Sequence, residues 1–278
     1  MSGNQPAFQA PPARFRLRVR YVKRGRLAYL GHLELIHTIE RCVRRAAFPY
    51  AVSQGFSPHM RIGYTSALPV GTSSACEYYD VFLTELVPAR EALERLVNAT
   101  PVDIAPNAVA YIDLRAPALT AQITRVRYLV ELAFRQGLAP AGDEFAQALA
   151  RLGVQGEIPY TRGKKRKALD VRRTLVSVGG AVHEDDRATL EFDTRCDNEG
   201  SLRPEIVIAA LDQLLRGLAP GDEEIVSTGM QDLTRIAGSR IERVAQLVER
   251  PEGALAPPLP DASEPPAGTL LAKALANI

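Results

Sequence analysis

The chain has 278 residues, 46% of them hydrophobic, and its 34 basic and 32 acidic residues leave a net charge of +2. This length suits two domains of about 100 residues with tails. No apolar run approaches the roughly 18 residues of a membrane helix, and residues 1–13 do not resemble a secretory signal, so we expect a cytoplasmic protein without a membrane partner. Three cysteines, far apart in the chain and without a CxxC pair, predict no disulfide framework.

The chain opens with a Pro- and Ala-rich segment, residues 1–13, which is predicted to be disordered. From residue 14 apolar residues alternate with arginines. Phe15, Leu17, Val19 and Tyr21 share one side of the segment. A period of two predicts a half-buried strand with its arginines on the face away from the core.

The rest of the first half alternates helical and strand patterns. Apolar spacings of three and four predict helices over 31–47 and 87–100. Strand patterns follow over 60–69, 76–85 and 102–113. The resulting order is β-α-β-β-α-β, which predicts an N-terminal ferredoxin-like domain over residues 14–116.

Near residue 117 the pattern restarts in a looser form. Strands are predicted at 124–134, 157–162, 168–180 and 187–195, helices at 143–153 and 203–217, and a closing segment at 223–233. We therefore expect an α+β protein of two ferredoxin-like sandwiches, the second over residues 117–232, related by a divergent duplication. An α+β fold without duplication is the alternative.

Residues 233–278 read as a weakly ordered, Pro/Ala-rich tail. Within it we expect a short helix at 240–249 and a short docking helix at 270–278.

Motifs for metal, nucleotide or redox chemistry are missing from the sequence, which therefore predicts no metal site and no cofactor. His32 and His37 are five residues apart, unlike an i, i+4 zinc pair, and there is neither a GxxxxGK[ST] loop nor a GxSxG elbow. His32 is the candidate catalytic residue. At the start of a helix its imidazole favours the neutral form, which suits a general base that cleaves RNA at the 2′-hydroxyl. The alternative is a structural histidine that caps the helix.

Positive charge is concentrated in two blocks. Residues 14–26 hold seven basic residues and no acid, and residues 162–173 hold seven against one acid. Such blocks favour contact with a polyanion, RNA above all, over a merely soluble surface. The predicted RNA contacts are Arg16, Arg18, Arg20, Arg41, Arg44, Arg45, Lys164, Lys165, Arg166, Lys167 and Arg172.

A run of motifs resembles the radical SAM-associated protein family of unknown function. The matching residues are Tyr29-Leu30-Gly31-His32-Leu33-Glu34-Leu35, Glu40-Arg41, Arg44-Arg45-Ala46, the loop Ser53-Gln54-Gly55-Phe56-Ser57-Pro58, Leu68-Pro69-Val70-Gly71 and Glu77-Tyr78, with Leu169-Asp170-Val171-Arg172 and Ser201-Leu202-Arg203-Pro204-Glu205 in the second half.

This resemblance implies context, because members of that family accompany radical SAM enzymes. The chain has no CxxxCxxC triplet and so lacks the ligands of an iron–sulfur cluster. We therefore expect an accessory protein that binds RNA, or docks to a radical SAM enzyme, in tRNA or rRNA modification. The alternatives are a metal-independent RNA endonuclease using His32 and a protein adaptor without RNA contact. The motif loop is either a turn or a phosphate-binding loop, and Glu77 is expected to pair with Arg61 on a neighbouring strand.

Overall fold

A computed structural model describes residues 11–196, 201–227 and 231–259 of the chain. These residues form two compact units. Unit 1 contains the described residues of Met1–Pro69, Ala75–Gln122 and Pro257–Ile278, and unit 2 contains Val70–Ser74 and the described residues of Ile123–Ala256. The predicted disorder of residues 1–13 falls mostly outside the described residues, as does the predicted helix at 270–278. The domain bounds 14–116 and 117–232 stay predictions.

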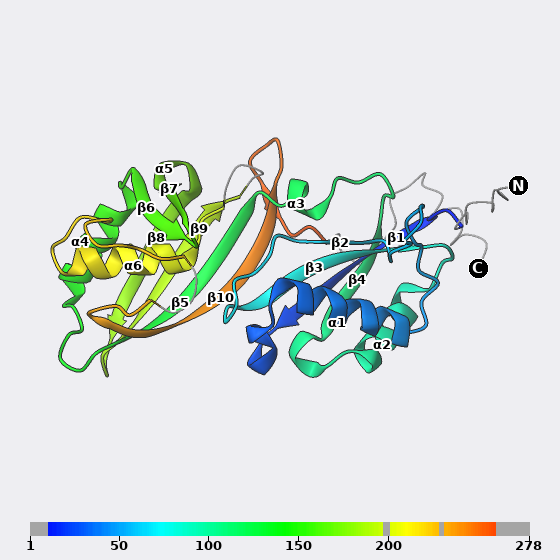
Figure 1. Ribbon diagram of the computed structural model, residues 1–278, viewed down its shortest axis with the longest axis horizontal. Coiled ribbons are helices and arrows are strands. Elements are labelled where there is room, and N and C mark those ends of the chain that lie inside the picture. Colours follow the sequence, from blue (N-terminus) through cyan, green and yellow to red (C-terminus); the bar gives the residue numbers. More distant parts are fainter. Residues whose placement is uncertain (1–10, 197–200, 228–230, 260–278) are drawn as a thin grey trace, which may run out of the picture. The chain divides into compact units, whose positions relative to one another are not determined.

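Unit 1 is a small sheet with two helices on one face (Figure 1). Its strands lie in the order β4-β1-β3, with β2 paired to β3, and both the β1–β4 and the β2–β3 pairs are antiparallel. Its elements are β1 (Phe15–Lys23), η1 (Gly25–Tyr29), α1 (His32–Arg45), β2 (Ile62–Tyr64), β3 (Ser73–Leu83, whose first two residues belong to unit 2), α2 (Ala89–Ala99), η2 (Val102–Ile104), β4 (Pro106–Ile112) and α3 (Leu119–Gln122).

The core of unit 1 follows from the predicted periodicities. Leu17 and Val19 of β1 are fully buried against Ile39 and Val43 of α1 and Leu96 of α2. Each such side chain contributes roughly 1.5–3 kcal/mol through burial. The predicted helices at 31–47 and 87–100 are thereby confirmed.

Unit 2 has a four-stranded antiparallel sheet in the order β10-β5-β9-β8, with α4 and α6 packed together over one region of it (Figure 1). A separate two-stranded ribbon consists of β6 and β7. Its elements are β5 (Arg125–Phe134), α4 (Gly142–Gly153), β6 (Glu157–Arg162), β7 (Lys165–Asp170), α5 (Val171–Thr174), β8 (Leu175–His183), β9 (Arg187–Arg195), α6 (Pro204–Leu215), β10 (Ile236–Glu249) and β11 (Leu255–Ala256).

The mixed α+β class is confirmed, but the prediction for the first part of the tail, a weakly ordered segment with a short helix, is wrong. The segment 240–249 is not a helix, because Ile236–Glu249 forms β10 along the whole of β5. The register shifts between Arg243 and Ala245, and this irregularity breaks the period of two by which a strand is detected in sequence. The predicted single strand at 168–180 is also wrong, since Asp170 caps a helical turn, α5, that separates β7 from β8.

Candidate functional site

The β6–β7 ribbon carries the strongest concentration of exposed positive charge in unit 2. The two strands pair from Glu157–Asp170 to Arg162–Lys165, and Gly163, at φ 60°, closes the turn between them. The exposed cations of the ribbon are Arg162, Lys164, Lys165, Arg166 and Lys167. Among the residues that the structure describes, none of these five forms an ion pair.

The pairing register decides which of these cations share a face. Residues directly opposite one another point to the same side, and that side alternates along each strand. Arg162 lies opposite Lys165, and Tyr160 lies opposite Lys167. Three cations and one half-buried tyrosine therefore lie on a single face of the ribbon, while Arg166 lies on the other face.

The ribbon is fixed near its base and again close to its turn. Ile158 and Leu169, another directly opposite pair, are buried. Thr161 N–H donates to Ile225 O at 2.8 Å, and Ser227 N–H donates to Thr161 O at 2.9 Å. The cations thus stand on a positioned support, so an anion that binds them does not have to order a flexible loop.

The first predicted basic block behaves differently, because Arg16 and Arg18 are interior residues. Arg16 Nη2 lies 2.7 Å from Asp80 Oδ2, and Arg18 Nε lies 2.7 Å from Asp80 Oδ1. Arg16 also donates to Pro117 O at 3.0 Å, and Arg18 to Pro258 O at 2.7 Å. The expectation that these two arginines face solvent is wrong, because chain segments distant in sequence cover the second face of β1.

The remaining predicted cations are on the surface or near it. Arg20 is half-buried and donates from Nε to Asn107 Oδ1 at 2.7 Å. Arg41, Arg44 and Arg45 are exposed on α1, where Glu40 lies 3.9 Å from Arg44 and partly offsets the charge. Arg172 is exposed in α5 of unit 2, close in sequence to the ribbon. Whether any of these bind RNA stays a prediction.

His32 lies at a small pocket in unit 1, formed with Tyr21, Leu35, Ile36, Tyr64, Thr65, Ser66, Leu68 and Glu77. Its ring meets that of Tyr64 edge-on at a centroid distance of 6.4 Å, and burial raises the pKa of the Tyr64 phenol above its ordinary value. The pocket volume is about 10 Å³, which corresponds to one water molecule and leaves no room for a nucleotide.

Glu77 is not the partner of Arg61. The Glu77 carboxylate is buried and accepts from Thr65 Oγ1 at 2.9 Å, while the guanidinium of Arg61 lies 4.5 Å from the centre of the Phe82 ring. The register explains the difference, because Phe82 N–H donates to Arg61 O and so places Phe82, not Glu77, beside Arg61.

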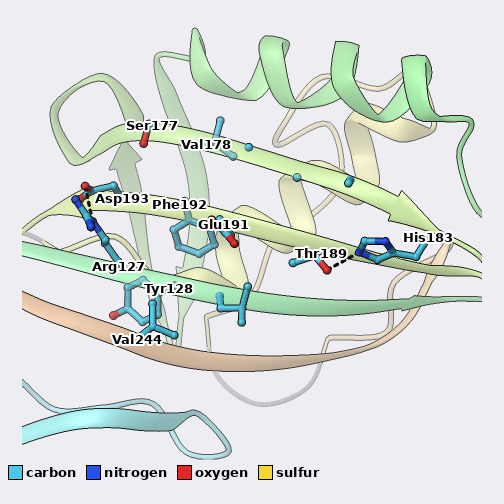
Figure 2. A pocket seen from close by; sticks show the side chains of 14 residues that line it. Arg127, Tyr128, Ser177, Val178, His183, Thr189, Glu191, Phe192, Asp193 and Val244 are labelled. Atoms are coloured by element: carbon cyan, nitrogen blue, oxygen red, sulfur yellow. Dashed lines mark hydrogen bonds and ion pairs between the residues drawn. The ribbon is translucent and has the colours of Figure 1, made fainter.

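A broad groove, which the sequence did not predict, lies on the sheet of unit 2 and has a volume of about 950 Å³. Figure 2 shows Arg127 beside Asp193 at one end and His183 beside Thr189 at the other, with Glu191 between them. The Arg127 Nε to Asp193 Oδ2 distance is 3.1 Å. Burial raises the pKa of Asp193, but hydrogen bonds from Arg125 and Arg127 outweigh it, so the net pKa is below the ordinary value. Charges of both signs make this groove a poor match for phosphate.

Small residues hollow the groove, and they are its only signal in the sequence. Ser177, Gly179 and Ala181 of β8 line it beside the larger side chains of β5 and β9. In the ranges that the structure describes, no three His, Cys, Asp or Glu side chains gather as a metal site would require, and no helix is both long and apolar enough to span a membrane.

Comparisons with known proteins give a family and distant structural likenesses. No curated protein matches the sequence. A chain of the "Crystal Structure of a Cbf5-Nop10-Gar1 Complex" is similar at a TM-score of 0.42 and 8% identity, over 87% of this chain and 56% of that one. A chain of the "Structure of H/ACA RNP bound to a substrate RNA containing 2'-deoxyuridine" is similar at 0.40 and 9%, over 88% and 54%. This chain therefore spans about half the length of the solved chains it resembles.

The match to a family covers more than half of the sequence, and its description names neither an activity nor a radical SAM partner. The chain belongs to the family described as "Uncharacterized protein conserved in bacteria (DUF2344)", which matches residues 16–204.

Proposed function

We propose that the protein binds RNA through the β6–β7 ribbon. The observation that carries this proposal is the set of five exposed cations, Arg162, Lys164, Lys165, Arg166 and Lys167, which have no ion-pair partner among the described residues and stand on an anchored support. Cations of this kind bind phosphates by releasing counterions. The half-buried Tyr160 on the same face adds an aromatic surface of the type that RNA-binding proteins use.

The chemistry is proposed to lie with a partner. The pocket at His32 holds about one water molecule, which speaks against the alternative of a His32 endonuclease. The motif residues from Tyr29 to Glu77 resemble proteins that accompany radical SAM enzymes. We therefore extend the proposal to an accessory role beside such an enzyme, in tRNA or rRNA modification in the cytoplasm.

The proposal for the fold is a duplicated ferredoxin-like sandwich. Its support is the strand order, because β4-β1-β3-β2 in unit 1 and β10-β5-β9-β8 in unit 2 are both fourth, first, third, second when the ribbon is set aside. On this proposal the ribbon is an insertion in the second copy, which gives that copy its own binding element.

The test is the salt dependence of RNA binding. Total small RNA is mixed with the wild type and with Lys165→Ala/Lys167→Ala over a series of salt concentrations. Each lost phosphate contact lowers the slope of log K against log[salt] by about 0.7–0.9, so the double variant should lose roughly 1.4–1.8.

A matched control removes two arginines of α2 that are already paired, the exposed Arg90 and the half-buried Arg95. Arg90→Ala/Arg95→Ala changes the net charge by the same amount, but both side chains sit beside carboxylates four residues away. This control should keep the wild-type slope. If RNA is not retained even at low salt, or if both variants lose equal slope, the ribbon is not an RNA site.

A further inference from the structure

The motif loop presents an unusual side chain, because Phe56 at its tip is fully exposed, at 107% relative accessibility. The loop runs over Ser53–Pro58, and its residues from Gln54 onward are all exposed. Gly55 adopts φ 127°, a backbone conformation that favours glycine, and thereby lets the chain turn at the tip. The RNA proposal makes no use of this loop, which lies in unit 1.

The stem of the loop is ordered by hydrogen bonds. Val52 and Met60 form a bridge across its base. Ser53 N–H donates to His59 O at 2.8 Å, and His59 N–H donates to Ser53 Oγ at 3.0 Å. Pro58 fixes one further backbone angle. The loop is therefore a short, braced hairpin with an aromatic ring at its end.

The stem continues into the sheet of unit 1. Ala51 N–H donates to Phe82 O at 2.7 Å, and Arg61 N–H donates to Ala51 O at 2.9 Å. The guanidiniums of Arg61 and Arg16 both lie against the Phe82 ring, at 4.5 and 5.2 Å from its centre. Two guanidiniums thus cover the ring of Phe82 in the sheet, whereas the ring of Phe56 at the tip of the loop is fully exposed.

An aromatic ring on a preorganised support is the form that binding hot spots take. Burying a Phe side chain is favourable, and little conformational entropy is lost when the loop is already braced. The residues around Phe56, namely Gln54, Gly55, Ser57 and Pro58, are uncharged. They match the polar, uncharged surround of an aromatic anchor in a protein interface.

The same composition disfavours RNA as the occupant. Proteins that stack bases on aromatic rings set cations along the path of the backbone, and the loop from Gln54 to Pro58 has none. The phosphate-binding alternative for this loop has the same difficulty. Apolar contact with a protein needs no such charge.

We infer that Phe56 is a docking anchor that inserts into an apolar pocket, about the size of one aromatic side chain, on a partner protein. The ribbon of unit 2 and this loop of unit 1 are then two separate binding elements, one for a polyanion and one for a protein. The inference does not depend on the RNA proposal.

The experiment places a photoreactive p-benzoylphenylalanine at position 56 of the full chain, expressed in the native bacterium and irradiated there. The same group at Val154, an apolar residue of unit 2 with 72% exposure, is the control. Cross-linked products are treated with nuclease and identified by mass. The identified protein is then measured for binding to the wild type, to Phe56→Ser and to Phe56→Leu.

The expected result is one nuclease-resistant protein adduct found at position 56 and not at 154. Its affinity should fall roughly 10- to 100-fold with Phe56→Ser, the factor that corresponds to one buried Phe side chain, and should be largely kept with Phe56→Leu. Because Phe56 is fully exposed, Phe56→Ser should leave the urea midpoint and the RNA salt slope unchanged. An adduct with RNA, the same adducts at both positions, no adduct at 56, or an affinity indifferent to Phe56→Ser would each overturn the inference.

Discussion

Replacing Asp80 with Asn tests whether the buried charge cluster of unit 1 is as costly to break as its geometry implies. Asp80 has no exposed surface, and its two carboxylate oxygens accept four hydrogen bonds from Arg16 and Arg18 at 2.7–3.0 Å. The variant keeps the volume of the side chain but removes the only charge described in contact with these two guanidiniums. Two buried cations then face each other without compensation.

The expected loss of stability is large. Breaking a buried pair by removing one partner costs about 3–5 kcal/mol, chiefly because the remaining ion stays desolvated. Arg16 and Arg18 are both at most 5% exposed, because the segment from Ala116 to Gln122 and the carbonyl of Pro258 lie against their guanidiniums. The upper part of that range is therefore expected, although the carbonyl groups of Pro117 and Pro258 retain part of the hydrogen bonding.

Urea unfolding measures the effect, with a probe in unit 1 and another in unit 2. The unfolding midpoint of unit 1 should move to a lower urea concentration, and its free energy of unfolding should fall by about 3–5 kcal/mol. A matched control is Asp113→Asn, which changes one exposed carboxylate of the same unit and should shift the midpoint little. A loss below about 1 kcal/mol for Asp80→Asn would refute the account of a buried, mutually dependent charge cluster.

Three further changes address unit 2. Gly180→Ala places a methyl group 2.4 Å from the backbone oxygen of Thr189 and should cost about 1–3 kcal/mol in urea unfolding, whereas Gly179→Ala meets nothing within 4 Å and should be close to neutral. Asp193→Asn should destabilise the protein at neutral pH, because a carboxylate with a lowered pKa contributes stability at pH values above its ordinary pKa of 3.8. The difference in unfolding free energy from the wild type should shrink as the pH falls below 3.8. A difference that does not depend on pH would contradict the ion pairs of Asp193. Asp212→Ala removes the acceptor for three backbone N–H groups at the start of β10 and should cost roughly 2–4 kcal/mol, with Asp212→Asn milder; equal thermal midpoints for all three proteins would show that this tether is unimportant.

Local patterns predicted the four long helices α1, α2, α4 and α6 and most strands of the fold, because each buries one face and so repeats its apolar residues. The single-turn helices α3 and α5 are too short to show such a repeat. The strand β10 was not predicted, because its register shift near Arg243 interrupts the alternation of apolar and polar residues. Its first residue, Ile236, also donates a backbone hydrogen bond to Asp212 of α6, which is 24 residues away in the sequence. No local sequence pattern predicts this contact. A contact of that kind becomes visible only in the folded chain.

Sequence patterns predicted the exposure of the cations less well than they predicted the helices and strands. The exposed cations of the ribbon could be predicted, because side chains in a turn generally face solvent. Lys164, beside Gly163, is such a turn residue. The arginines of β1 have an equally regular pattern, yet Arg18 is buried, because a strand pattern reports alternation and not what covers the second face. The covering residues, Gln122 and Pro258, come from distant parts of the chain, and Asp80 gives no sign in the sequence that it accepts two arginines.

The bond from Arg18 to the carbonyl of Pro258 has a consequence for synthesis. Residue 258 belongs to unit 1, whereas nearly all of the preceding 130 or so residues belong to unit 2. A ribosome therefore releases the whole of the intervening unit before the last acceptor of Arg18 emerges. Because domains tend to fold in the order in which they leave the ribosome, unit 1 has to wait, with a buried arginine one acceptor short, until its neighbour has been made. We accordingly expect chains that are truncated within unit 2 to fold poorly and to be degraded readily by proteases.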